Sequence, residues 1–220
     1  MSLSFVFNDL EFCVPEKQTL RVSGKIESHE RVILQGPSGC GKTTFLRTLA
    51  SLWPARSGSA CLGERIVTNV DPSETRAGLV FQSGALIPHL NVWENVAFGL
   101  RFQNATRDWS RDLMFQHVRE KLEKLGLVAL AERSVGALSG GERQRVALLR
   151  TLIVSPDYLL LDEPLSALDP AMRTDLQDWI LTVIKEKPVP TIIVTHDASE
   201  ADRLGTRRVL WKGEDACLQF

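Results

Sequence analysis

The sequence predicts an α/β protein whose core is a mainly parallel β-sheet. Short apolar runs such as 158–161 and 192–194 are typical of strands that are buried on both faces of such a sheet. They alternate with amphipathic segments of helical period, including 139–153 and 170–185. The 220 residues are 44% hydrophobic and 24% charged, which is the composition of an ordinary globular protein.

The first 30 residues are expected to form an antiparallel β region. Segments 3–7 and 20–26 alternate between apolar and polar side chains, as half-buried strands do. Asn8-Asp9 and Pro15-Glu16-Lys17 supply turn chemistry between them. Segment 31–34 is a compact strand that runs into a glycine-rich turn, and 43–52 follows as a helix that Pro54 ends.

A strand at 78–81 and helices at 91–102, 109–125 and 139–153 come next. We expect the helices to form an inserted α-helical subdomain, 84–156, within a core domain made of 1–83 and 157–220. Asp169-Pro170 predicts a capped start for a helix at 170–185. A strand at 191–195, a helix at 198–204, and a hairpin of 208–211 and 216–220 around Lys212-Gly213 complete the predicted elements.

Charge, hydropathy and cysteine spacing exclude several classes of protein. The 26 Lys and Arg residues against 27 Asp and Glu residues leave no overall positive field, so we expect no nucleic-acid partner. No apolar run approaches the roughly 18 residues that span a bilayer, and the N-terminus lacks the basic flank of a signal peptide. The four cysteines show neither metal-site nor disulfide spacing, so reduced thiols are expected.

The strongest motif is GPSGCGKTT, which fits the GxxxxGK[ST] phosphate loop between a strand and a helix. Glycines let backbone N–H groups converge on a phosphate, and the helix N-terminus adds a favourable dipole. We expect Lys42 to bridge the β and γ oxygens of a nucleotide and the Thr43 hydroxyl to bind Mg2+. The predicted ATP-binding residues of this P-loop core are Gly36, Pro37, Ser38, Gly39, Cys40, Gly41, Lys42, Thr43 and Thr44. An ordinary glycine turn is the alternative.

Two acids follow the apolar run 158–161, at the sheet edge where ligands bind in α/β folds. Asp162 can hold Mg2+ there, and Glu163, which points differently, can polarise an attacking water. The alternative is that the pair solvates the end of a strand. A second glycine-rich helix start, LSGGE at 138–142, offers another anion site, but Ser139 and Glu142 also fit a plain capping box.

The order of the motifs resembles the ATP-binding cassette (ABC) family along nearly the whole chain. After the phosphate loop come Val80-Phe81-Gln82, LSGGERQR, LLLDEP, Ser166-Ala167-Leu168-Asp169 and Val194-Thr195-His196-Asp197. The resemblance implies that Gln82 contacts Mg2+ and water and that Asp162 is the metal-side acid. It implies that Glu163 is the catalytic base and that His196 contacts the γ-phosphate.

The resemblance also implies that the protein acts as a pair. Cassettes of this family pair head to tail, so ATP would lie between the Lys42 loop of one chain and the signature segment of the other. The signature residues are Leu138, Ser139, Gly140, Gly141 and Glu142. Asp169 corresponds to the D-loop aspartate. Phe12 is the nearest candidate for the aromatic residue that stacks on adenine, and a buried strand residue is the alternative.

The function that the resemblance implies is an ATP-hydrolysing subunit of a membrane transporter, most like importers of the iron, thiamine, molybdate and polyamine groups. We expect it on the cytoplasmic, inner face of the membrane, with a periplasmic or extracellular binding protein in the same system. Permease subunits are expected to dock near Gln82 to Val96, where 83–96 is unusually apolar. Core packing is the alternative for Val92 and Val96.

Two other functions are the alternatives to an importer subunit. One is the ATPase of an exporter or lipoprotein-release system. The other is a soluble cassette ATPase that acts on nucleic acid or ribosomes.

Overall fold

The computed structural model describes residues 3–15, 18–82, 84–211 and 217–219, and of the last three it describes only the backbone. The chain divides into two compact units. The first contains Met1–Leu79, Pro156–Glu163 and Ile184–Phe220, and the second contains Val80–Ser155 and Pro164–Val183. The second unit thus contains nearly all of the expected helical subdomain, and Pro164–Val183 in addition.

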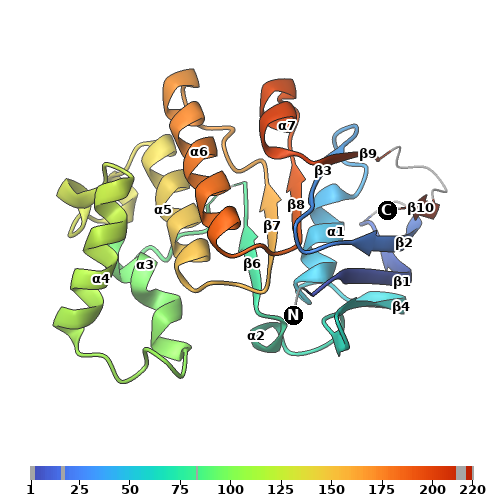
Figure 1. Ribbon diagram of the computed structural model, residues 1–220, viewed down its shortest axis with the longest axis horizontal. Coiled ribbons are helices and arrows are strands. Elements are labelled where there is room, and N and C mark those ends of the chain that lie inside the picture. Colours follow the sequence, from blue (N-terminus) through green and yellow to red (C-terminus); the bar gives the residue numbers. More distant parts are fainter. Residues whose placement is uncertain (1–2, 16–17, 83, 212–216, 220) are drawn as a thin grey trace. The chain divides into compact units, whose positions relative to one another are not determined.

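A five-stranded sheet lies at the centre of the first unit, in the order β6-β7-β8-β3-β9 (Figure 1). The strands are β3 (Arg31–Gln35), β6 (Ala77–Val80), β7 (Tyr158–Asp162), β8 (Thr191–Val194) and β9 (Arg207–Leu210). β3 pairs in parallel with both β8 and β9, and β7 pairs in parallel with β8. Every residue of β7 and β8 is buried, which explains their continuous apolar sequence. The predicted α/β class is confirmed.

A second sheet has the order β10-β2-β1-β4-β5. Its strands are β1 (Phe5–Cys13), β2 (Thr19–Ile26), β4 (Ala55–Leu62), β5 (Arg65–Ile66) and β10 (Cys217–Gln219). β1 pairs antiparallel with β2 and with β4, as the predicted antiparallel region requires.

The predicted turn at Asn8-Asp9 is wrong. β1 continues through it as a bulge, since its register with β2 shifts between Phe7 and Leu10 and Asp9 has a φ of 43°. Asn and Asp tolerate the left-handed conformation of a bulge as well as that of a turn, so the local signal is ambiguous.

The predicted C-terminal hairpin is also wrong. β9 lies parallel to β3 in the central sheet, whereas β10 lies parallel to β2 in the other sheet. Helix α7 (Ala198–Leu204) returns the chain to the start of the sheet, so β9 is added as a parallel edge strand. Lys212 and Gly213, around which the hairpin was expected, lie outside the described residues.

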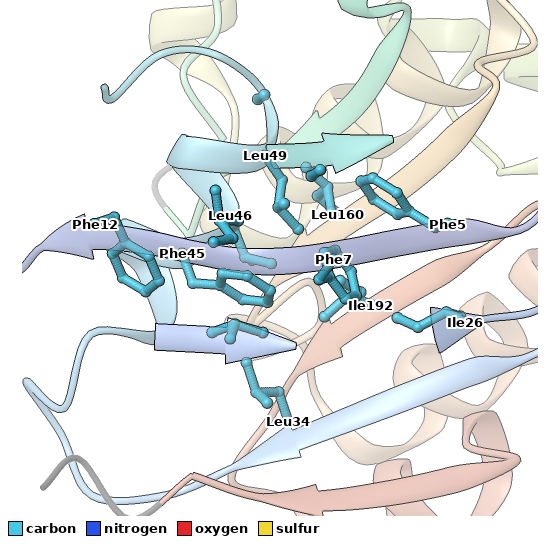
Figure 2. Packing of buried hydrophobic residues seen from close by; sticks show 14 of the residues in the cluster. Phe5, Phe7, Phe12, Ile26, Leu34, Phe45, Leu46, Leu49, Leu160 and Ile192 are labelled. Carbon is cyan, nitrogen blue, oxygen red and sulfur yellow. The ribbon is translucent and has the colours of Figure 1, made fainter. Parts of the chain in front are cut away.

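One hydrophobic core joins both sheets of the first unit to helix α1 (Lys42–Leu49), as Figure 2 shows. It includes Phe5, Phe7, Phe12, Leu34, Phe45, Leu46, Leu49, Leu160 and Ile192, each at most 2% exposed. Burial of each large apolar side chain stabilises the folded state by about 1.5–3 kcal/mol. Because α1 presents three of these residues, the helix that begins at the phosphate loop is held firmly.

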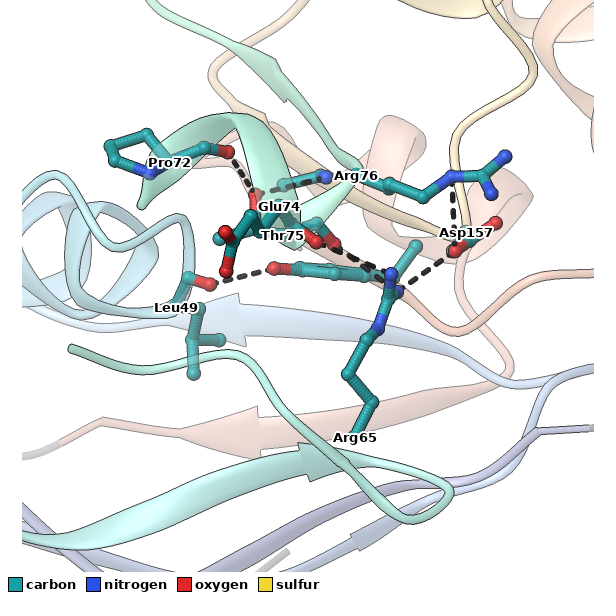
Figure 3. Close-up of polar contacts among 9 residues, drawn as sticks. Leu49, Arg65, Pro72, Glu74, Thr75, Arg76 and Asp157 are labelled. Atoms are coloured by element: carbon teal, nitrogen blue, oxygen red, sulfur yellow. Dashed lines mark hydrogen bonds and ion pairs between the residues drawn. The ribbon is translucent and has the colours of Figure 1, made fainter. Parts of the chain in front are cut away.

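A polar cluster ties the start of β7 to its neighbours (Figure 3). Arg65 and Arg76 both pair with Asp157, at 2.8 and 3.4 Å. The buried Tyr158 hydroxyl donates to the carbonyl of Leu49 at 2.7 Å, and burial raises the pKa of that hydroxyl so that it remains a donor. These contacts fix β7 at the end opposite to its acids.

The second unit is mainly helical. Its helices are α3 (Val92–Ala97), α4 (Arg111–Lys124) and α5 (Gly140–Ile153), with 3-10 turns at Phe98–Phe102, Val128–Leu130 and Val135–Ala137. Helix α6 (Pro170–Glu186) begins in this unit, and the short α2 (Pro72–Thr75) belongs to the first. Among the described residues, no helix combines the length and apolar character needed to cross a membrane.

Candidate nucleotide site

The phosphate loop connects β3 to α1 and requires glycine for two different reasons. Gly41 has a φ of 99°, and a Cβ there would lie 2.8 Å from Val14 and 2.9 Å from Leu20. Gly36 has no such φ, but a Cβ on it would lie 2.1 Å from a backbone oxygen. Lys42 is 6% exposed, and its Nζ donates to the carbonyls of Gly36 (2.8 Å) and Pro37 (2.7 Å). The loop therefore folds around the lysine that the motif predicts.

The acid at the end of β7 lies beside the first turn of α1. Thr43 Oγ1 donates to Asp162 Oδ2 at 2.7 Å, so two of the three residues predicted to contact Mg2+ are in direct contact. Burial raises the pKa of Asp162, the charge of Glu163 adds to this, and the Thr43 hydrogen bond opposes it. A buried carboxylate beside a hydroxyl is the oxygen donor set that Mg2+ prefers, so these residues fit the ion.

Glu163 is the next residue, and its backbone turns away from the strand. Its φ is 48°, which few non-glycine residues adopt, and its N–H donates to the Val194 carbonyl at 2.9 Å. Its Oε1 lies 3.0 Å from His196 Nε2. The side chains of Glu163 and His196 are 21% and 51% exposed, so this pair faces solvent while Asp162 does not. The two neighbouring acids thus point into different environments, as the sequence analysis expected.

Three polar side chains hold the backbone around His196, and sequence analysis assigned no role to any of them. Thr195 Oγ1 donates to Glu200 Oε2 at 2.7 Å, and Asp197 N donates to Thr195 Oγ1 at 3.1 Å. Asp197 caps α7 by accepting from the backbone N–H of Glu200 at 3.0 Å. Since Thr195 and Glu200 are both 3% exposed, this is a buried clamp that fixes both neighbours of the histidine.

Phe12 does not form an adenine platform. Its ring is fully buried and stacks on Phe45, with centroids 5.7 Å apart (Figure 2). A base cannot reach either face, so the interpretation as a stacking residue is wrong and the buried-strand alternative holds. The pattern of β1 explains this, because Phe5, Phe7 and Phe12 all enter the core.

The signature segment lies in the second unit and starts α5. Ser139 and Glu142 form a reciprocal capping box, with Ser139 N donating to Glu142 Oε2 at 2.6 Å. These hydrogen bonds hold the pKa of Glu142 below its usual value. Ser139 is exposed and Gly140 half-buried. The capping-box interpretation is therefore confirmed. The N-cap residue itself, Ser139, is exposed at the N-terminus of α5.

The segment Pro164–Val183 belongs to the second unit, and its residues Ala167 and Leu168 pack on the start of α5. The buried Gln144 side chain accepts a hydrogen bond from Ala167 N at 3.0 Å, and a Cβ on Gly141 would lie 2.9 Å from Leu168 Cδ2. Asp169 is exposed, and its carboxylate caps α6 by accepting from Met172 N at 3.0 Å. The predicted capped helix start is thus present.

The expected docking segment is only partly on the surface. Gln82 is exposed, and Ser83 lies outside the described residues. Val92 and Val96 are fully buried, as the core-packing alternative holds, whereas 85, 88 and 89 are exposed. The buried Asn95 amide holds the loop by bonding both the N–H (2.8 Å) and the carbonyl (3.1 Å) of Ile87. The loop that precedes α3 is therefore ordered by its own unit.

These motifs and this fold define an ATP-binding domain. The sequence model of one family, described as ABC transporter, matches residues 19–166. The chain belongs to the ABC transporter family.

Curated relatives and solved structures agree with this family assignment. The chain is 42% identical over 207 residues to a sulfate/thiosulfate import ATP-binding protein of Cucumis sativus, covering 87% of this chain and 59% of that protein. It is 45% identical over 185 residues to the maltose/maltodextrin import ATP-binding protein MalK of Salmonella typhimurium, covering 84% and 49%. The chain thus spans about half the length of these relatives.

A solved structure matches with a TM-score of 0.85 and 28% identity, over 95% of this chain and 94% of the other. It is described as the dimeric structure of a post-hydrolysis state of the ATP-binding cassette MJ0796 bound to ADP and Pi.

Proposed function

We propose that this chain is the ATP-hydrolysing subunit of a membrane import system. The observation that supports it most is the contact of Thr43 with Asp162 beside the Glu163–His196 pair, at the end of the phosphate loop. Proteins 42% to 46% identical to the chain are named import ATP-binding proteins, which favours import over export. The substrate group predicted from the sequence stays a prediction.

In this proposal each residue of the first unit has a separate task. Lys42 leaves the loop carbonyls to neutralise the β and γ oxygens of ATP, and the loop N–H groups bind the same phosphates. Thr43 and Asp162 would hold Mg2+, and the bound ion would supply positive charge that offsets the negative charge developing on the phosphates. Glu163 accepts a proton from the water that attacks the γ-phosphorus, and the bond from that phosphorus to the β–γ bridging oxygen breaks, so that ADP and phosphate are released. His196 holds the carboxylate and contacts the γ-phosphate.

The second unit supplies the remaining roles. We propose that two copies pair head to tail, so that the exposed start of α5 at Ser139 meets the ATP held by the other copy's Lys42 loop. The helix dipole and N–H groups there stabilise phosphate charge. Gln82 contacts Mg2+ and water, and Asp169 lies at the junction of the two copies. The dimeric state named for the related cassette supports this arrangement.

The first test concerns the base. Glu163→Gln keeps the shape of the side chain and removes its charge, so ATP should bind while phosphate release falls by about 10²- to 10⁴-fold. The trapped ATP should hold the variant as a dimer in size-exclusion chromatography. Glu64→Gln is the matched control, because Glu64 is exposed on the connection between β4 and β5. Rapid turnover by Glu163→Gln would contradict the assignment of the base.

The second test concerns the partners. We propose that permease subunits bind the exposed loop before α3, that the chain lies on the cytoplasmic face, and that an extracytoplasmic binding protein serves the same system. Tagged protein isolated from its native membrane should bring polytopic membrane subunits, identified by mass spectrometry. Ala85→Asp should lose them without loss of ATP hydrolysis, whereas Ala105→Asp, another exposed position of the same unit, should keep them. Recovery of ribosomes instead would contradict the transport function.

A further inference from the structure

Trp211, the residue that follows β9, touches both arms of the phosphate loop. Its backbone N–H donates to the Gln35 carbonyl at 2.6 Å, where the loop begins. Its indole Nε1–H donates to the Cys40 carbonyl at 2.7 Å, where the loop ends. The residue is fully buried. A single residue, through its backbone at one end and its side chain at the other, thus connects the two ends of the loop.

Packing makes this connection stiff. The indole ring lies 5.0 Å from the Phe45 ring on α1, measured between centroids. On the other arm, a Cβ on Gly36 would lie 2.1 Å from the Trp211 carbonyl oxygen, which means that the two backbones are in close contact. The loop cannot shift toward Trp211 at Gly36, and α1 cannot shift at Phe45, without displacing this residue.

The indole bond also orients a peptide group of the loop. A trans peptide is planar, with its C=O and N–H pointing in opposite directions. Because the Cys40 carbonyl is held on the indole, the N–H of Gly41 is directed away from Trp211. Backbone N–H groups of such a loop are the groups that bind phosphate, so their orientation decides how well the loop fits it.

We propose that Trp211 is a positioning residue of the phosphate loop, which raises ATP affinity through the hydrogen bond from its indole N–H to the Cys40 carbonyl. This inference rests on the proposed binding of ATP at the loop. Trp211 does not contact the reacting atoms in this proposal, since it acts through the backbone of Cys40 and Gly41.

The test removes the N–H without emptying the site. Benzothienylalanine at position 211 keeps the ring volume and replaces the N–H by sulfur, and Trp211→Phe is a simpler second variant. Loss of one hydrogen bond should weaken ATP and ADP binding by about 2- to 10-fold, measured by calorimetry well below the melting temperature. KM for ATP should rise while kcat changes little.

Tyr158→Phe is the matched control, because it also deletes a buried bond from an aromatic ring to a backbone carbonyl, at Leu49. It should lower the melting temperature and leave ATP affinity unchanged. Wild-type affinity in the benzothienylalanine protein would overturn the inference, even if Trp211→Phe bound ATP poorly, because packing alone would then explain the loss. Failure of the unaltered protein to bind ATP would overturn the proposed function, and this inference with it.

Discussion

Replacement of Thr195 by valine should both destabilise the protein and slow ATP hydrolysis. Valine has nearly the shape of threonine but lacks the hydroxyl that donates to Glu200 Oε2 and accepts from Asp197 N. Glu200 is 3% exposed, so water does not readily replace the lost donor. Both hydrogen bonds of the Thr195 hydroxyl, which hold the backbone next to His196, would be lost.

The size of the effect follows from burial. Leaving a buried acceptor without its donor costs about 1–3 kcal/mol. For a domain of this size, each kcal/mol shifts the melting temperature by roughly 2–4 °C, so a fall of about 2–12 °C is expected. The distance of 3.0 Å between His196 and Glu163 depends on the same loop, so kcat should fall more than the KM for ATP rises.

Thermal unfolding and steady-state phosphate release measure both effects. Thr191→Val is the matched control, since Thr191 is the first residue of β8, the strand that Thr195 directly follows, is fully buried, and donates to the neutral carbonyl of Val189 at 3.0 Å. Thr191→Val should lower the melting temperature less than Thr195→Val does and should leave kcat unchanged. Thr195→Ser should behave like the original protein. Equal losses of stability and activity in Thr195→Val and Thr191→Val would refute the reasoning.

Three further predictions concern the first unit. Gly41→Ala should abolish ATP binding and lower stability by about 1–3 kcal/mol, because Gly41 has a φ of 99° and Val14 lies in the way; calorimetry and melting check this. Burial raises the pKa of Asp162, so its contribution to stability is complete below the unfolded pKa of about 3.9 and is lost as the pH rises through the raised folded pKa. Without Mg2+, Asp162→Asn should therefore melt above the original protein at neutral pH but not near pH 4. Phe12→Leu should lower the melting temperature and leave ATP affinity unchanged, which calorimetry would contradict if the ring contacted adenine.

The sequence predicted those helices, strands and loops whose local sequence pattern matches their environment in the folded protein. Helix α7 has the predicted bounds, 198–204: Asp197 caps its start, and its apolar residues Ala201 and Leu204 are buried. β7 and β8 were recognisable because strands buried on both faces need continuous apolar runs. The phosphate loop was recognisable because its chemistry restricts both residue type and spacing.

The parts that sequence analysis missed depend on distant partners. β4, with the sequence ARSGSACL, shows almost no strand pattern, and its pairing with β1 makes it a strand. The C-terminal hairpin failed for the same reason, since β9 takes its partner from β3 rather than from its neighbour in sequence. A local turn signal at Lys212-Gly213 cannot distinguish these outcomes.

The residues that hold the candidate site in place were also missed, because their partners lie far away in the sequence. Thr43 and Asp162 are 119 residues apart but both lie in motifs, so their contact could be anticipated. Trp211 and Cys40 are 171 residues apart, and the tryptophan reaches a backbone carbonyl, which leaves no pattern in the sequence. The residues that hold the motifs in place belong to no motif: Trp211 bonds the backbone of the loop, and Glu200 accepts from the Thr195 hydroxyl. It follows that changes at Trp211 or Glu200 should alter the ATPase while every motif residue stays intact.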